Sequence, residues 1–544
     1  MMLGRSFIAV GCACAGWAMG CRVDPESVST QAARDEGSGT VTHARPQVVK
    51  TGELIYEVLD EKTGKRTPAK LTINGTRGTR DPRFSRGDIG REDEDEQSLA
   101  AFNRVFTMSG AGKVTLPAGS YDVTISRGPE WTISVHRVSI GAKPVAIAGK
   151  IKHVIETPKW VSGDFHVHAA SSPDSRVPMR DRVYEFVADG VDMIVSTDHN
   201  VAADYAPHIK ELNAGKWLAS AIGNEVTSGE WGHFGAFPLP QEMVEEGQGA
   251  IPTRRKSAKE LFSSIRELAP GAIIDVHHPR LEEAIGYFYL GRFDEKTDRA
   301  GRKGFSYDFD AVELLNGYQD TNRKSLDRTM ADWFALLGCG HMVTATGNSD
   351  THHLTYNLGG YPRNYVLVDN DDPAVVTPKM VAKGLRARHA FFTTAPFVSF
   401  TVGSAGIGDV APAPGGRAKA EIVVRAAPWV SVSRVIVYVG GKIERTFEVA
   451  KSEAVERFRM VYDLQVAKDT HVVVRVEGDQ PLTPVVGGSG SVAITPLALT
   501  NPIFLDVNGN GKYDPINPHG AHVPAKDDPG ADKPPAPAGA GHRH

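Results

Sequence analysis

Cysteine is scarce in this chain. Of 544 residues only four are cysteines, and Cys12, Cys14 and Cys21 lie close to the N-terminus. Cys339 is the one cysteine in the rest of the chain, which excludes a disulfide framework.

The chain also has no large excess of positive or negative charge, because it contains 61 Lys and Arg and 65 Asp and Glu. The chain therefore lacks the basic footprint of a nucleic-acid-binding protein, and we expect no nucleic acid partner.

Long hydrophobic runs are also missing, with one exception near the N-terminus. The stretch "SFIAVGCACAGWAMG" is apolar, follows a positive charge at Arg5, and is too short to span a membrane as a mature helix. It ends in small residues before Cys21, which resembles a bacterial lipoprotein signal. We expect a lipoprotein signal peptide over residues 1–20, export, and a lipid anchor at Cys21 as the sole membrane attachment. Arg22 favours the outer membrane, and a plain secretory signal is the alternative.

The rest of the chain divides by its apolar pattern. Residues 21–47 are polar without periodicity, which is typical of a linker. Alternating β-branched and aromatic segments predict a β-sandwich over 48–151 and a second one over 396–505. Between them, residues 160–395 alternate apolar strands with helical stretches, which indicates parallel βα units and suits a barrel. The expected fold class is multidomain α/β plus β, and the acidic cluster Glu92–Glu96 is expected to be a solvated loop.

Histidine and carboxylate residues recur at the ends of the apolar segments in the middle domain. His166 and His168 alternate on "DFHVH", so both project from one strand face and suit one metal ion. The following segments end in Asp198, His199, Glu225, His233, His277, His278, Asp350 and His352. The carboxyl ends of parallel barrel strands share one face, so these residues predict a metal site there. Strand alternation leaves open whether His277 or His278 is the ligand.

The motifs that carry these residues resemble one known family. The pieces "GDFHVHAASSPDS", "ADGVDMIVSTDHN", "GNEVTSGEWGHFGAF", "DVHHPR", "AVELLNG" and "GNSDTHH" together resemble the PHP (polymerase and histidinol phosphatase) metallohydrolase domain, in its CehA/McbA-like branch. The resemblance implies a distorted (β/α)7 barrel, flanked here by two small β-sandwiches. It also implies two or three divalent ions, such as zinc, manganese or iron.

Carried over residue by residue, the resemblance implies one ligand set for each ion. The sets are His166, His168, Glu225 and Asp350 for the first ion; Glu225, His233 and His278 for the second; and Asp174, His199 and His352 for the third. Glu225 would bridge the first two ions. His278 is preferred to His277 because the family pairs this histidine with a following proline.

These sets predict a metal-dependent hydrolase of a small-molecule ester. A hydroxide between the first two ions, beside Glu225, would attack a phosphorus or carbonyl centre, and neighbouring ions would stabilise the developing charge. We expect Asp198 to orient an imidazole, and Arg280 either to bind a substrate anion or to form a surface salt bridge. Whether the bond is a phosphoester or a carboxylic or carbamate ester stays open. The alternative is a catalytically inactive scaffold lipoprotein that binds through its β-sandwiches, which the complete ligand set disfavours.

A second kind of metal site is predicted near the C-terminus. In "DVNGNGKYDPIN", Asp506, Asn508, Asn510 and Asp514 occupy calcium-loop positions. The twelfth position is Asn517 instead of a bidentate Glu, which implies low affinity. A tight Asn-Gly turn without metal is the alternative. The remaining residues to 544 are rich in Pro, Ala, Gly and Asp and predict a disordered tail.

Overall fold

The computed structural model describes residues 50–85, 89–245, 251–281, 285–297, 299–317, 323–354, 356–487 and 493–515. The predicted signal peptide, Cys21, the linker and the C-terminal tail lie outside these residues. Within them, no helix has the length and apolar character needed to cross a membrane.

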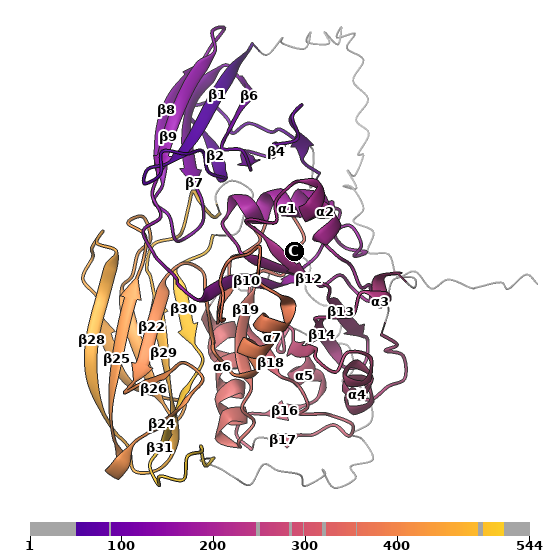
Figure 1. The fold of residues 1–544 in the computed structure, drawn as a ribbon, viewed down its shortest axis with the longest axis vertical. Coiled ribbons are helices and arrows are strands. Elements are labelled where there is room, and N and C mark those ends of the chain that lie inside the picture. Colours follow the sequence, from indigo (N-terminus) through magenta and orange to yellow (C-terminus); the bar gives the residue numbers. More distant parts are fainter. Residues whose placement is uncertain are drawn as a thin grey trace, which may run out of the picture. The chain divides into compact units, whose positions relative to one another are not determined.

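The N-terminal part is a sandwich of two β-sheets (Figure 1). The smaller sheet has the order β6–β1–β9, formed by Ala111–Pro117, Thr51–Asp60 and Val145–Ile151. The larger sheet has the order β3–β4–β5–β2–β7–β8, formed by Arg91–Glu92, Ser98–Ala101, Arg104–Thr107, Ala69–Thr76, Gly119–Ser126 and Ser134–Ile140. Strand alternation turns Leu54, Leu71 and Val123 into the core between the sheets, where all three are buried.

Among its described residues, the middle part contains two mixed sheets and seven helices. One sheet runs β12–β11–β10–β20–β21, formed by Ala219–Ala221, Met193–Ser196, Trp160–Val167, Arg363–Leu367 and Ala390–Thr393. The other runs β13–β14–β15–β18–β19, formed by Asn224–Ser228, Gly232–Phe237, Ile273–Val276, Ala311–Asn316 and Thr344–Asn348. The helices are α1 (Met179–Ala188), α2 (Ala206–Glu211), α3 (Glu242–Glu245), α4 (Ala258–Leu268), α5 (Tyr287–Leu290), α6 (Arg323–Gly338) and α7 (Pro378–Arg386). A hairpin of β16 (Phe293–Asp294) and β17 (Arg299–Ala300) follows α5.

Two isolated β-bridges join these sheets, one at or just beyond the carboxyl ends of β10 and β19 and the other between the carboxyl end of β11 and the amino end of β13. Val167, at the end of β10, pairs with Thr351 after β19, and His199, after β11, pairs with Glu225 of β13. Strands β10, β11, β13, β14, β15, β18 and β19 thus follow one another through their ladders and these two bridges. The predicted ligand residues lie on or beside both bridges.

The prediction of parallel βα units is wrong for part of this domain. Pairs β10–β11, β11–β12, β15–β18 and β18–β19 are parallel, but β13–β14, β14–β15 and β10–β20 are antiparallel. Strands β13 and β14 are separated only by residues 229–231. A connection this short permits a hairpin, whereas a parallel return needs a crossover of a dozen residues or more.

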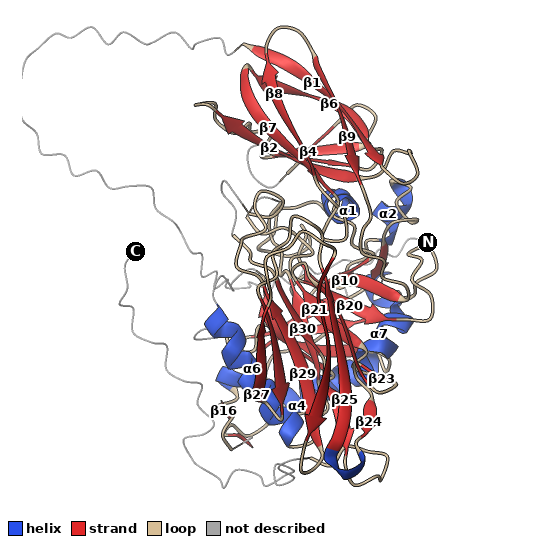
Figure 2. Ribbon diagram, turned by 90° about the vertical axis from the view of Figure 1, so that its left-hand side faces the viewer, coloured by secondary structure: helices blue, strands red, loops and turns tan. Residues whose placement is uncertain are grey.

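The C-terminal strands extend the first sheet of the middle part (Figure 2). Strand β21 pairs with β30 (Leu497–Thr500), and the sheet continues through β29 (Thr470–Glu477), β26 (Arg434–Val439) and β27 (Lys442–Glu448). Strand β31 (Ile503–Asp506) also pairs with β29, and β24 (Val410–Pro412) pairs with β31. A second sheet packs on it in the order β23–β22–β25–β28, formed by Ala405–Gly406, Phe397–Val402, Arg417–Arg425 and Glu456–Gln465. The boundary expected at residue 395 therefore falls inside one continuous sheet.

The acidic cluster Glu92–Glu96 is only in part the solvated loop expected from its charge, since Glu94, Asp95 and Glu96 are exposed but Glu92 and Glu96 have ion-pair partners. Arg180 of α1 donates to both carboxylate oxygens of Glu92, at 2.9 and 3.0 Å, and to Glu96 at 3.0 Å. The Tyr184 hydroxyl donates to the Glu96 carbonyl at 2.7 Å. The partners lie more than 80 residues away along the chain, which is why local charge pattern does not reveal them.

Candidate metal centre

The nine ligands implied by the family resemblance come together, but not all at carboxyl strand ends as expected, because Glu225 and His233 lie at the amino ends of β13 and β14. The nine ligands form four overlapping groups: His166, His168 and Asp350; His166, Glu225 and His278; His199, Glu225 and His233; and His168, Asp174, His199 and His352. Within each group the candidate ligand atoms lie within 4.8 Å of one another. Imidazole and carboxylate groups this close suit transition metals such as zinc, iron or manganese.

The first group joins β10 to the loop after β19. The Nε2 atoms of His166 and His168 lie 3.1 and 3.2 Å from Oδ1 of Asp350. All three side chains are buried, and none of these three atoms makes a hydrogen bond. Buried polar atoms in native proteins are normally satisfied, so their convergence here fits a bound cation.

Glu225 belongs to two groups and has six imidazoles within 4.0 Å of its carboxylate, four of which belong to those groups. Its Oε1 is 3.1 Å from His166 Nε2 and 3.3 Å from both His278 Nε2 and His233 Nδ1. Its Oε2 is 2.7 Å from His199 Nδ1. Burial would raise the pKa of Glu225, but His233, His199 and His166 hold it well below its usual range. Glu225 is thus an anion placed where two cations could share it.

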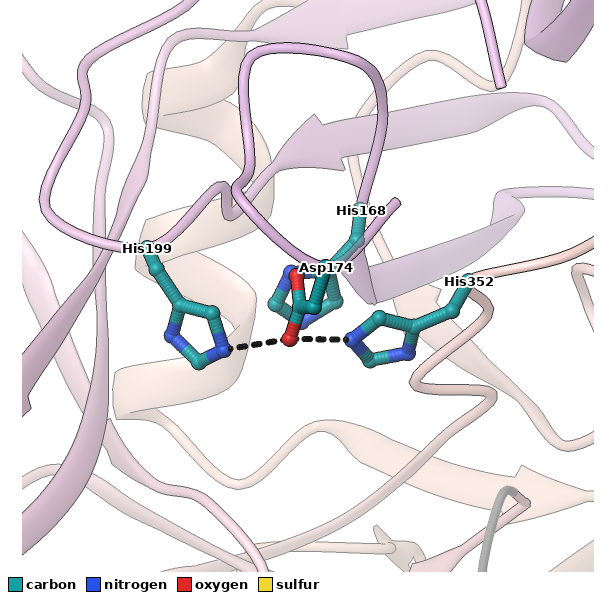
Figure 3. A group of neighbouring side chains, drawn as sticks. All are labelled: His168, Asp174, His199 and His352. Atoms are coloured by element: carbon teal, nitrogen blue, oxygen red, sulfur yellow. Dashed lines mark hydrogen bonds and ion pairs between the residues drawn. The ribbon is translucent and has the colours of Figure 1, made fainter. Parts of the chain in front are cut away.

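Asp174 lies between two histidines at the more exposed end of the centre (Figure 3). Its Oδ2 is 3.0 Å from His199 Nε2 and 3.1 Å from His352 Nε2. His168 completes this group, and its ring stacks on His352 with centroids 4.0 Å apart. Burial would raise the pKa of Asp174, but hydrogen bonds from His199 and His352 hold it far below its usual range.

Hydrogen bonds to Nδ1 orient the imidazoles that point Nε2 inward. The partners are Glu313 Oε1 for His166 (3.1 Å), Ser172 Oγ for His168 (3.2 Å), Thr227 Oγ1 for His199 (2.6 Å) and the Asp350 carbonyl for His352 (2.8 Å). A carbonyl only accepts, so Nδ1 of His352 carries the proton. A hydrogen bond from Nε2 to Asp174 therefore requires the doubly protonated ring. Burial would lower the pKa of His352, but hydrogen bonding to Asp174 and the charge of Asp350 raise it. A divalent cation between Nε2 and the Asp174 carboxylate would take the place of this proton.

Sequence reasoning does not identify Glu313, which supports two ligands from behind. Its Oε1 accepts from His166 Nδ1, and its Oε2 accepts from the His278 amide at 2.8 Å. Asn316 donates to Glu313 Oε2 at 2.9 Å and to Asp350 Oδ2 at 3.0 Å. The detectable signal is a glutamate inside the apolar strand "AVELLN", because a buried carboxylate requires partners.

The structure separates the roles of His277 and His278. His278 belongs to a ligand group with His166 and Glu225, and His277 belongs to none among the described residues. Nδ1 of His277 lies 2.9 Å from Glu225 Oε1, and its ring stacks on His166 at a centroid distance of 3.6 Å. His277 therefore orients Glu225, which leaves His278 as the ligand candidate.

Arg280 does not bind at the centre, so the substrate-binding role expected for it is not supported. Its guanidinium donates to both carboxylate oxygens of Asp332, at 2.8 and 2.6 Å, and to the Phe293 carbonyl at 2.8 Å. The side chain is only 7% exposed. The salt bridge named as its alternative is present, in buried form.

Asp198 supports the loop after His168 and makes no hydrogen bond to an imidazole. Its Oδ1 accepts from the Ala169 amide at 2.7 Å, while Oδ2 makes no hydrogen bond. Burial raises the pKa of Asp198 to about 7. The Asp198 backbone also belongs to the β-bridge between His199 and Glu225, because the Glu225 amide donates to the Asp198 carbonyl at 3.1 Å.

A pocket of about 230 Å³ opens over the ligand groups. Its lining consists of Asp174, His199, Glu225, His233, His278, Leu281, Ile285, Asp350, His352 and His353. The described lining thus contains carboxylates and imidazoles, two aliphatic side chains, and no lysine or arginine. A small molecule entering this pocket would contact the candidate metal ligands directly.

Comparisons with known proteins leave the family open. No family model matches the chain, and no curated protein matches it in sequence. A solved structure from Bifidobacterium adolescentis, described as a metal-dependent phosphoesterase, shares 15% identity at a TM-score of 0.25 and covers 35% of this chain and 87% of its own. An amidohydrolase from Chromobacterium violaceum shares 12% identity at a TM-score of 0.26 and covers 36% of this chain and 89% of its own. Similarity this low does not show a family.

The predicted calcium-loop residues also lie together. Asn508 and Asn510 donate to Asp514 Oδ2 at 2.6 and 2.8 Å, and Asp506 accepts from the amides of Gly509 and Gly511 at 2.7 Å each. These hydrogen bonds join polar groups of the loop to one another, as in a tight turn without metal. Asn517, at the twelfth position, lies outside the described residues. Calcium binding stays a prediction.

Proposed function

We propose that this chain is a metal-dependent hydrolase of the PHP type, in the CehA/McbA-like branch. The observation that carries the proposal is the centre itself: nine side chains form four overlapping groups around one pocket. Buried atoms of His166, His168, Glu225 and Asp350 that make no hydrogen bond converge there. A scaffold that had lost catalysis would have no need for such a complete set. We propose two or three divalent ions, zinc, manganese or iron.

Divalent ions held in these groups would lower the pKa of a bound water toward neutrality and polarise the oxygen of the scissile bond. The chain's own residues keep the geometry for this chemistry. Glu225 fixes the spacing between the groups that share it, and Glu313 and Asn316 hold His166, His278 and Asp350 in place.

We propose a small-molecule phosphoester or a carboxylic or carbamate ester as the substrate. The pocket volume of about 230 Å³ suits a small reacting group. Arg280 is paired with Asp332, so the ions would supply the positive charge that meets an anionic substrate.

The test is a screen of metal-reconstituted protein. Activated phosphate monoesters, phosphodiesters, carboxylic esters and carbamates are offered with Zn²⁺, Mn²⁺ or Fe²⁺, and His168→Ala serves as the inactive control. We expect turnover of one class that His168→Ala abolishes. Equal turnover by the variant would refute this centre as the active site, and metal-free wild-type protein after gentle purification would favour the scaffold.

We also propose export and lipid anchoring at Cys21, supported by the apolar segment that precedes it. Labelling with a radioactive fatty acid in a bacterial host, with Cys21→Ser as the control, tests this. Equal labelling of the variant would exclude Cys21 as the anchor.

A further inference from the structure

Four of the nine candidate metal ligands lie on two neighbouring loops. The first loop, residues 168–174, carries His168 and Asp174, and the second loop, residues 350–353, carries Asp350 and His352. One backbone hydrogen bond joins the loops directly, from the His168 amide to the Thr351 carbonyl at 3.1 Å. The regular β-ladder does not continue beyond this point, so other groups must hold the loops together.

Arg182 of α1 provides those contacts from behind the centre. Its Nε donates to the His168 carbonyl at 3.0 Å, and its Nη2 donates to the Thr351 carbonyl at 3.0 Å. Its Nη1 donates to the Thr351 hydroxyl at 3.0 Å and to the His353 carbonyl at 3.4 Å. One planar guanidinium therefore bonds both loops at once, in a geometry that lysine cannot reproduce.

The charge of Arg182 is balanced within the same helix. Glu185 Oε2 accepts from Arg182 Nη1 at 2.6 Å, and both side chains are fully buried. Glu185 Oε1 accepts from the Gly359 amide at 2.8 Å, which fastens the segment after the second loop as well. A fully buried ion pair is costly to desolvate and is weak evidence for stability by itself. Its contacts to ligand-bearing backbone point to positioning.

We infer that Arg182, supported by Glu185, is a positioning residue that sets the register of the two ligand loops and thereby the metal affinity of the centre. The inference rests on the proposed metal-dependent function. It assigns Arg182 no contact with substrate or ion. Removing residues that orient metal ligands typically weakens metal binding about 10–100-fold.

The experiment compares wild type, Arg182→Lys, the charge-neutral double variant Arg182→Met/Glu185→Gln, and Arg180→Met. Arg180 is the matched control because it lies on α1 too, but its ion pairs are with Glu92, Glu96 and Glu211. Metal-free proteins are titrated with Zn²⁺ against a chromogenic chelator. Co²⁺-loaded proteins are compared by visible absorption, and melting of each metal-free protein reports folding.

We expect Arg180→Met to bind Zn²⁺ with the affinity of wild type. The double variant should bind Zn²⁺ about 10–100-fold more weakly and show a changed Co²⁺ spectrum. The Zn²⁺ affinity of Arg182→Lys should lie between those of wild type and the double variant. Wild-type affinity and spectrum in the double variant overturn the inference, even if its metal-free form melts earlier. If the double variant does not fold, Arg182→Lys decides, and unchanged affinity overturns the inference. A wild type that binds no Zn²⁺ refutes the proposed function and the inference together, whereas equal binding by all four proteins refutes the inference alone.

Discussion

His199 and Glu225 interact through both their backbones and their side chains. Their backbones form the β-bridge that joins the end of β11 to β13, and Nδ1 of His199 lies 2.7 Å from Oε2 of Glu225. Glu225, whose backbone pairs with His199 to join β13 to the end of β11, therefore also carries the carboxylate shared by two ligand groups. Fold and metal centre depend on the same pair.

Replacing Glu225 by Gln should lower metal content and turnover together. The amide keeps the shape but removes the charge that two groups share, so we expect loss of at least one ion. Loss of a residue that only orients a ligand costs about 10–100-fold, so turnover should fall by more than about 100-fold. Elemental analysis and steady-state rates measure both. The control is Glu230→Gln, on the exposed hairpin after β13. Unchanged metal content in Glu225→Gln would contradict the shared-ligand assignment.

Asp174→Ala should remove one ion and leave the others bound. Its carboxylate is 45% exposed and touches only the group at the open end, whereas the groups around Glu225 do not contain it. Metal-dependent stabilisation should therefore persist in part, since a ligand at about 100 times its Kd stabilises by about 2.7 kcal/mol per site. Thermal unfolding with and without EDTA, together with metal counting, measures this. Asp369→Ala, at an 88% exposed position, is the control. A variant that loses every ion would show that the groups do not bind independently.

Most of the ligand residues could be predicted from the sequence because they lie at or just after the end of a short apolar strand. His166 and His168 alternate across the end of β10, whereas Glu225 and His233 are the second residues of β13 and β14 and do not follow the expected pattern. Such local signals survive without knowledge of the fold. The direction of β14 could not be read in the same way, because hairpin geometry at residues 229–231 overrides the strand–helix rhythm.

Support for the ligands was harder to predict because it depends on distant pairs. Glu313 meets His166 across 147 residues, and Arg182 meets Thr351 across 169. Arg280, in contrast, stands next to a ligand motif yet pairs with Asp332 on α6. Proximity in sequence to a metal motif thus says little about which charged residue faces the pocket.

The ion pair of Lys70 and Asp189 should make the N-terminal sandwich part of the folding unit. Nζ lies 2.7 Å from Oδ2, and both side chains are fully buried. Lys70→Met leaves the buried Asp189 carboxylate without its ion partner, with the Tyr361 hydroxyl still donating to it at 3.2 Å, and should cost about 3–5 kcal/mol of unfolding free energy. Lys70→Met/Asp189→Asn should recover part of this loss. Urea denaturation measures each variant.

The control for this pair is Lys62→Met, which removes a partner of Glu156 in a pair where both side chains are 70% exposed. Its effect should stay below about 1 kcal/mol. Similar losses at positions 62 and 70 would show that burial of the Lys70 pair contributes nothing.

His471 should make the protein less stable in mild acid. It lies buried in β29 against Phe334, with no hydrogen bond on either ring nitrogen, and burial lowers its pKa from 6.5 to about 4. Between about pH 4 and about pH 6.5, His471 is protonated in the unfolded chain but stays neutral in the folded chain. The free energy of unfolding therefore falls as the pH drops from about 6.5 to about 4, and it levels off below about pH 4. This group contributes a decrease of at most about 3 kcal/mol.

His471→Phe removes the titration, so its unfolding free energy should change less over this range than that of wild type. The half-exposed His208→Gln is the control, measured by urea denaturation at several pH values with the metal removed. Parallel curves for wild type and His471→Phe would show that His471 does not carry the acid sensitivity.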